Sequence, residues 1–157
     1  DTIARGLEAF MPVSGRLQRK TAASGATVID DTYNANPDSV RAAIDVLAGF
    51  GAPRVLVLGD MGEVGSEGKS FHEEIGAYAA ERGIEHVLVT GDLMRHAAAA
   101  GAPVARHFDD FDSLKRDAEA LATAGATVLV KGSRFMRMER VVNHLVDPQS
   151  AKQTETH

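Results

Sequence analysis

Two acids and two asparagines follow an apolar run in the first quarter of the chain. In the segment IDDTYNANPDSV, Asp30 and Asp31 end the run, and Asn34 and Asn36 lie in the turn after it. Pro37 then opens an amphipathic pattern typical of a helix. Carboxylates and amides between a strand end and a helix N-terminus are typical of sites that bind nucleotides or phosphorylated ligands in open α/β sheets.

Each of these side chains also has a purely structural interpretation. Asp31 and Asp30 either accept hydrogen bonds from ribose hydroxyls, by analogy with dinucleotide-binding folds, or serve as turn acids. Asn36 suits the N-cap of the following helix, and a capped N-terminus also forms an anion site, so its two roles are compatible. Asn34 is a candidate to bind a base or a phosphate.

A second polar group follows an apolar run near the C-terminus. The segment VLVKGSRFMRMERV has Lys131, Ser133 and Arg134 between a predicted strand and a predicted helix. Cations, a hydroxyl and helix N–H groups together suit a carboxylate ligand. The alternative is a solvated helix start that happens to be basic.

The glycine-rich segment LGDMGEVG is not a phosphate-binding signature, and neither GxxxxGK[ST] nor GxGxxG occurs in the chain. A domain that binds a nucleoside triphosphate alone usually needs such a lysine-bearing loop, so we expect another domain to supply it. Asp60 and Glu63 are candidates to approach a metal or substrate, with ordinary loop acids as the alternative. His72 has no second ligand at i+4 and is expected to be a partly exposed helix histidine. The sequence predicts neither a metal site nor a catalytic nucleophile.

Composition limits the class of protein. The chain has 157 residues, a formal net charge of -5 and no cysteine. These values indicate one globular domain without a disulfide framework and argue against nucleic-acid binding. No apolar run approaches the roughly 18 residues of a membrane span, and the chain opens without a signal-peptide pattern or a methionine. We therefore expect a cytoplasmic protein without membrane contact, and an excised piece of a longer chain.

Apolar periodicity predicts an α/β fold. Strands are expected over residues 17–22, 27–31, 54–60, 86–90, 104–108 and 127–131, and helices over residues 3–10, 37–50, 71–82, 93–100, 113–121 (capped by Asp112) and 138–145. This alternation is typical of a Rossmann-like, doubly wound, mostly parallel sheet of about six strands, with the first two paired as a hairpin at one edge. One domain, residues 1–146, and a disordered polar tail, residues 147–157, are expected. The loops after the parallel strands should share one edge of the sheet.

Four segments together identify a family. GRLQ, IDDTYNANPDS, VLGDMGEVG and VLVKGSRFMRMERVV resemble the C-terminal domain of a Mur ligase, over about residues 3–145. DDTYNANP and KGSRFMRME are the most specific, and they are most similar to the branch that adds D-alanyl-D-alanine to UDP-N-acetylmuramoyl-tripeptide. Val64 departs from the usual GDMxELG pattern, a chemically trivial change.

The resemblance implies a reaction and partner domains. Family members have a domain for the UDP-sugar peptide, a central domain with the phosphate-binding loop, and a Rossmann-like third domain, which alone matches this chain. With ATP and Mg²⁺, the full enzyme converts the substrate carboxylate to an acyl phosphate, which the amine of D-alanyl-D-alanine attacks. No catalytic residue is expected in this domain itself.

The resemblance also assigns residues to two binding sites. It implies nucleotide binding by Arg16, Asp31, Tyr33, Asn34 and Asn36, and D-alanyl-D-alanine binding by Lys131, Ser133, Arg134 and Phe135. One alternative is another Mur ligase or a folylpolyglutamate synthase, against which the YNANP turn argues. The other is a non-catalytic, doubly wound ligand-binding module. An upstream GxxxxGK[ST] motif in the parent gene would argue against that module.

Overall fold

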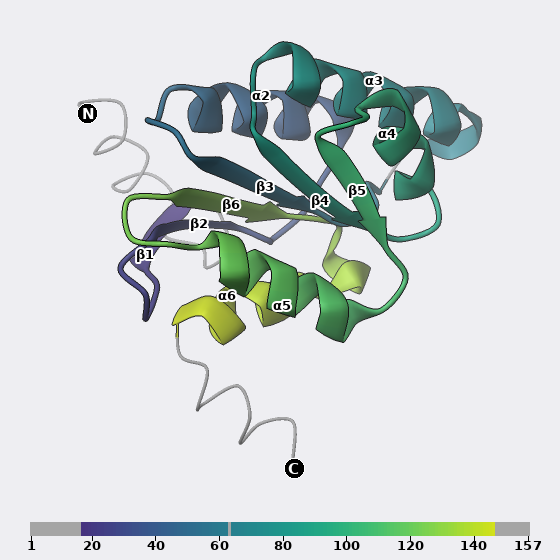
Figure 1. Ribbon diagram of the computed structural model, residues 1–157. Coiled ribbons are helices and arrows are strands. Elements are labelled where there is room, and N and C mark those ends of the chain that lie inside the picture. The colour runs from purple at the N-terminus through teal and green to yellow at the C-terminus, as the bar shows by residue number, and fades with distance from the viewer. Residues whose placement is uncertain (1–16, 63, 147–157) are drawn as a thin grey trace.

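A computed structural model describes residues 17–62 and 64–146, in which strands and helices alternate along the chain (Figure 1). The elements are β1 (Gln18–Thr21), β2 (Thr27–Asp31), α2 (Pro37–Ala48), β3 (Arg54–Leu58), α3 (Gly68–Glu81), β4 (His86–Thr90), α4 (Met94–Ala100), β5 (Ala105–Phe108), α5 (Phe111–Leu121), β6 (Thr127–Lys131) and α6 (Glu139–Val146). Short 3-10 turns precede α3 and α6, at Gly65–Glu67 and Arg134–Met136. The helix expected over residues 3–10 and the tail over residues 147–157 lie outside the described residues.

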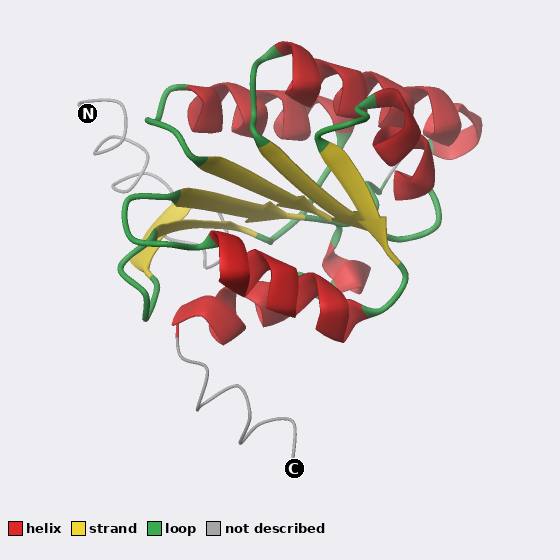
Figure 2. Cartoon of the chain, in the orientation of Figure 1, coloured by secondary structure: helices red, strands yellow, loops and turns green. Residues whose placement is uncertain are grey.

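The six strands form one sheet in the order β1-β2-β6-β3-β4-β5. β1 pairs antiparallel with β2, and every other neighbouring pair is parallel. Helices α2, α3 and α4 cover one face, and α5 and α6 cover the other (Figures 1 and 2). The predicted α/β, doubly wound, mostly parallel fold with an edge hairpin is therefore confirmed.

Each face of the sheet has its own apolar core, because successive strand residues point to opposite sides. Ile29 and Leu129 pack toward α2 and α3, whereas Val28 and Val128 pack toward α5 and α6. The same alternation sends the side chains of Asp30 and Asp31 to opposite faces. The register aligns Lys131 at the end of β6 with Asp31 on one side and Leu58 on the other, so three strands end side by side.

Local signals explain where two helices begin. The Asn36 side chain accepts a hydrogen bond from Ser39 N, and the Ser39 hydroxyl accepts one from Asn36 N, which forms a capping box in front of Pro37. The expected cap of α5 is wrong by two residues. Asp110 is the N-cap, accepting from Ser113 N at 3.1 Å, and Asp112 lies in the first helical turn.

Two further sequence-based boundaries shift slightly. β3 ends at Leu58 rather than at residue 60, because Asp60 turns away to bond the start of α4. α3 begins at Gly68, ahead of the predicted residue 71. In the part of the chain that is described, no helix is both long enough and apolar enough to span a membrane.

Candidate functional site

Backbone hydrogen bonds join the loops after β2, β3 and β6 into one continuous edge. Gly62 N donates to Ala35 O at 2.9 Å, which links the first two loops. Ser133 N donates to Asp60 O at 3.0 Å, which links the second to the third. The expectation that these loops share one edge is therefore confirmed, and the edge brings together residues about 100 positions apart.

A buried ion pair lies at the centre of this edge. Lys131 Nζ is 2.8 Å from Asp31 Oδ2, and both side chains are almost completely buried. Lys131 also donates to Asn34 O at 2.9 Å, and Leu17 N donates to Asp31 Oδ1 at 3.3 Å. Burial raises the pKa of the Asp31 carboxyl, and the Lys131 charge counteracts part of that rise. Asp31 is thus held in a fixed orientation by two donors.

Asp31 faces a cavity of about 280 Å³ beside the start of α2, here named the α2 pocket. Tyr33, Asn34, Asn36 and Lys131 also line this pocket. Four of the residues assigned to nucleotide binding by sequence therefore lie together, next to a capped helix N-terminus. Arg16, the fifth, lies outside the described residues.

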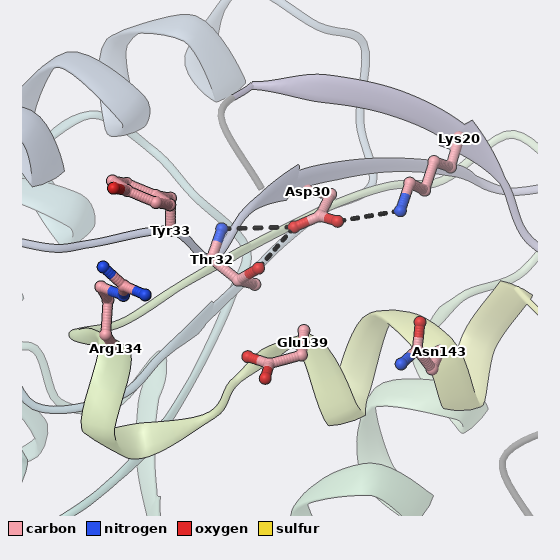
Figure 3. Close-up of a pocket in the computed structure, with 7 residues that line it drawn as sticks. All are labelled: Lys20, Asp30, Thr32, Tyr33, Arg134, Glu139 and Asn143. Carbon is pink, nitrogen blue, oxygen red and sulfur yellow. Dashed lines mark hydrogen bonds and ion pairs between the residues drawn. The ribbon is translucent and has the colours of Figure 1, made fainter. Parts of the chain in front are cut away.

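A second cavity of about 390 Å³, here named the α6 pocket, lies on the opposite face (Figure 3). Asp30 is fully engaged there, accepting from Lys20 Nζ at 2.9 Å and from Thr32 Oγ1 at 2.6 Å. The Arg134 guanidinium stacks over the Tyr33 ring, 4.9 Å from its centre. Tyr33 lines both pockets and forms the wall between them. Of the two adjacent acids, Asp31 therefore faces the α2 pocket and Asp30 acts as a turn and ion-pair acid.

The residues assigned by sequence to the dipeptide do not share one pocket. Lys131 points into the α2 pocket and Arg134 lines the α6 pocket. Ser133 is 3% exposed, and its hydroxyl has no hydrogen-bond partner among the described residues. Phe135 is 70% exposed and lines neither pocket. Ser133 is the member whose unmet hydrogen bond indicates a ligand.

The loop after β3 is held by residues with structural roles. Asp60 accepts hydrogen bonds from Met94 N at 2.9 Å and Leu93 N at 3.3 Å, as an ordinary loop acid does. Glu63 lies outside the described residues. In residues 17–62 and 64–146, no group of three or more His, Asp or Glu side chains is arranged to hold a metal ion.

The expectation of a partly exposed His72 is wrong. His72 is fully buried, its Nε2 accepts from Met61 N at 3.1 Å, and its Nδ1 lies 2.7 Å from Gly68 O. Because Met61 N is a donor, the ring proton is on Nδ1. His72 therefore holds the loop after β3 in place through its hydrogen bond with Met61 N. No pattern in the sequence indicated this role, since the partners of His72 are backbone groups.

Burial lowers the pKa of His72, which makes stability depend on pH. The folded chain keeps this imidazole neutral, whereas the unfolded chain takes up a proton near pH 6.5. The free energy of unfolding should therefore be fully retained above that pH and fall below it by up to about 1.4 kcal/mol per pH unit. Urea denaturation at several pH values between 5 and 8 measures this slope.

His72→Gln is the matched control for this prediction, because its amide can still accept from Met61 N and donate to Gly68 O. The variant should lose part of the wild-type slope between pH 5 and 6.5 while remaining folded. An identical slope in both proteins would show that His72 is not the group responsible.

Comparisons with known proteins show which sequences and folds this chain resembles. The curated UDP-N-acetylmuramoyl-tripeptide--D-alanyl-D-alanine ligase of Escherichia coli K12 is 40% identical, over 92% of this chain and 32% of its own length. A crystal structure of MurF from Acinetobacter baumannii matches with a TM-score of 0.78 and 34% identity, covering 90% of this chain and 32% of that one. MurF ligase from Thermotoga maritima in complex with ADP matches with a TM-score of 0.74 and 30% identity, covering 83% and 30%.

These relatives also define the extent of the match. The chain spans about a third of the length of the curated relatives, 32% for the Escherichia coli enzyme. The family model described as "Mur ligase, glutamate ligase domain" matches residues 15–134, which include the α2 pocket and the start of the loop after β6. The chain belongs to this family of Mur ligase domains, as the resemblance of its four segments predicted.

Proposed function

We propose that this chain is the C-terminal domain of an ATP-dependent ligase that adds D-alanyl-D-alanine to UDP-N-acetylmuramoyl-tripeptide. One observation supports this above all others. The α2 pocket, with its buried carboxylate, and Ser133, with its unmet hydroxyl, lie on loops that are linked through the loop after β3 by backbone hydrogen bonds. A nucleotide and an acceptor bound at these loops would be close neighbours.

In the α2 pocket, the Asp31 carboxylate would accept hydrogen bonds from the ribose hydroxyls of ATP. Asn34 and Asn36 line the same pocket, next to the capped N-terminus of α2. Tyr33 offers an aromatic surface, and Arg16 is proposed as a further nucleotide contact. A relative solved with ADP supports a nucleotide as the ligand.

At the neighbouring loop, Ser133 is proposed to hydrogen-bond the incoming dipeptide. Arg134 and Phe135 are exposed beside it and would meet the dipeptide or the partner domain when the enzyme closes. The domain would thus act by positioning an amine against an activated carboxylate, which can supply a large part of the rate enhancement.

The remaining chemistry is assigned to the other domains of the full-length ligase. They would bring the UDP-sugar peptide and the loop lysine that neutralises the β- and γ-phosphates. Mg²⁺ is proposed to bind there too, because the described residues of this chain offer no suitable group of ligands. The reaction is proposed to occur in the cytoplasm.

Steady-state kinetics of the full-length ligase tests the proposal. Wild type should release phosphate from ATP only when both the UDP-sugar tripeptide and D-alanyl-D-alanine are present. Asp31→Ala should raise the KM for ATP about tenfold or more, and Ser133→Ala should raise the KM for the dipeptide about fivefold, since each removes one hydrogen-bonding group. Ser113→Ala, in α5 and lining neither pocket, is the control and should change neither value.

Two outcomes would change the proposal. Phosphate release stimulated by another amino acid would indicate a different ligase of the same family. Absence of release with every acceptor would favour a non-catalytic ligand-binding module.

A further inference from the structure

Lys131 connects the end of β6 to the turn after β2, which is the turn that carries the proposed nucleotide contacts. Taking the proposed function as its basis, we infer that Lys131 is a positioning residue of the nucleotide site. It orders the turn from Asp31 to Asn34 and does not contact the dipeptide. This separates Lys131 from Ser133, its near neighbour in sequence.

The hydrogen bonds of the Lys131 ammonium hold the turn at two points. One goes to Asp31 Oδ2 at 2.8 Å and the other to Asn34 O at 2.9 Å. The first fixes the direction of the carboxylate, and the second fixes the backbone three residues later. Lys131 is only 3% exposed, so water does not compete strongly for either bond. A single cation therefore ties the Asp31 carboxylate to the backbone of the turn.

The ammonium is also turned toward the nucleotide side of the edge. It lines the α2 pocket, whereas Arg134 lines the α6 pocket on the other face of the sheet. A lysine ammonium has three donors, and two of them are bonded within the described residues.

The adjacent acid supplies a matched control. Lys20 Nζ lies 2.9 Å from Asp30 Oδ2, so two Asp–Lys pairs occur one residue apart on opposite faces of the same strand. The Lys20 side chain is 35% exposed and comes from β1. It bonds no atom of the turn after Asp31. Removing either lysine deletes one cation, but of the two only Lys131 bonds the backbone of the nucleotide turn directly, at Asn34 O.

Steady-state kinetics of the full-length ligase with Lys131→Met and Lys20→Met tests the inference. Lys131→Met should raise the KM for ATP about tenfold or more, because two charge-assisted hydrogen bonds are lost, and should leave the KM for D-alanyl-D-alanine within about twofold. Lys20→Met should leave both values within about twofold. A rise in the dipeptide KM without a rise in the ATP KM would overturn the inference.

A second pair of variants covers the case in which Lys131→Met does not fold, because it leaves a buried carboxylate without its cation. The double variant Asp31→Asn/Lys131→Met buries no unpaired charge, and Asp31→Asn, whose buried Lys131 can lose its proton, is its reference. The two should share the same dipeptide KM, and the double variant should have the higher ATP KM. A higher dipeptide KM in the double variant would indicate that Lys131 contributes to dipeptide binding and would overturn the inference.

Amide hydrogen exchange separates this inference from the proposed reaction. It needs no substrate and reports the order of residues 33–36 directly, leaving out Thr32, whose N–H is bonded by Asp30. Exchange there should be faster in Lys131→Met, or in the double variant relative to Asp31→Asn, and unchanged in Lys20→Met. Unchanged exchange would overturn the positioning role. If the variants show this exchange pattern but the wild-type ligase forms no amide bond, the proposed reaction is wrong and the positioning role of Lys131 is still supported.

Discussion

Gly76→Ala is expected to destabilise the domain by about 3 kcal/mol, near the upper end of the usual cost of overpacking. A Cβ atom on residue 76 would lie 2.1 Å from the carbonyl oxygen of Ala97 and 2.7 Å from its carbonyl carbon. Both atoms belong to the backbone of α4, so no side-chain rotation relieves the clash. Helices α3 and α4 would have to move apart along their whole contact.

This change would also reach the candidate site. α3 carries His72, whose ring holds Met61 N, and α4 begins at the N–H groups bonded by Asp60. Separating the two helices therefore loosens the loop after β3 from both sides. Denaturant unfolding gives the loss of stability, and thermal unfolding should show a midpoint lower by roughly 10 °C.

Gly51→Ala is the control for the cost of adding a methyl group. A Cβ atom there meets nothing within 4 Å. The free energy of unfolding of Gly51→Ala should stay within about 0.5 kcal/mol of the wild-type value, as for most surface changes. If Gly76→Ala were as stable as Gly51→Ala, the close packing of α3 on α4 would be wrong.

Most of the fold was predictable because its strands are unusually clear. The apolar runs over β3, β4 and β6 are continuous, as expected for parallel strands covered on both faces. The order of the strands was not predictable from periodicity. β6, the last strand in the chain, lies between β2 and β3, and no local pattern encodes that insertion. This insertion brings Lys131 beside Asp31.

The site was predictable in its residue types and less so in its partners. Asp30 and Asp31 look alike in sequence, and only the side-chain alternation of β2 decides which one faces the α2 pocket. Lys131 and Ser133 look like one group, yet the Lys131 side chain bonds the turn after β2, whereas the Ser133 hydroxyl has no partner among the described residues. His72 was missed because both of its partners are backbone atoms, which leave no mark on the sequence.

The 157-residue chain by itself is expected to form no amide bond from ATP, UDP-N-acetylmuramoyl-tripeptide and D-alanyl-D-alanine. It has no GxxxxGK[ST] motif, so nothing neutralises the charge that moves onto the transferred phosphoryl group. Its described residues also offer no cluster of ligands for a metal ion. Positioning two substrates cannot compensate for both, because the acyl phosphate would not form.

The same division explains why the α2 pocket suits only part of a nucleotide. Its volume of about 280 Å³ and its carboxylate suit a ribose more than a triphosphate, because the Lys131 cation that lines the pocket is already paired with Asp31. On the proposed function, the phosphates would extend out of the pocket toward another domain. Closure of that domain over the edge would bring the activated carboxylate to the acceptor.

Mass spectrometry of the reaction products tests this division of labour most directly. The isolated chain and the full-length ligase are incubated at equal concentration with ATP, Mg²⁺, the UDP-sugar tripeptide and D-alanyl-D-alanine. The full-length protein should yield the peptide lengthened by two alanines together with ADP and phosphate, and the isolated chain should yield none above background. Amide formation by the isolated chain, or its absence from the full-length protein, would contradict the proposed role of this domain.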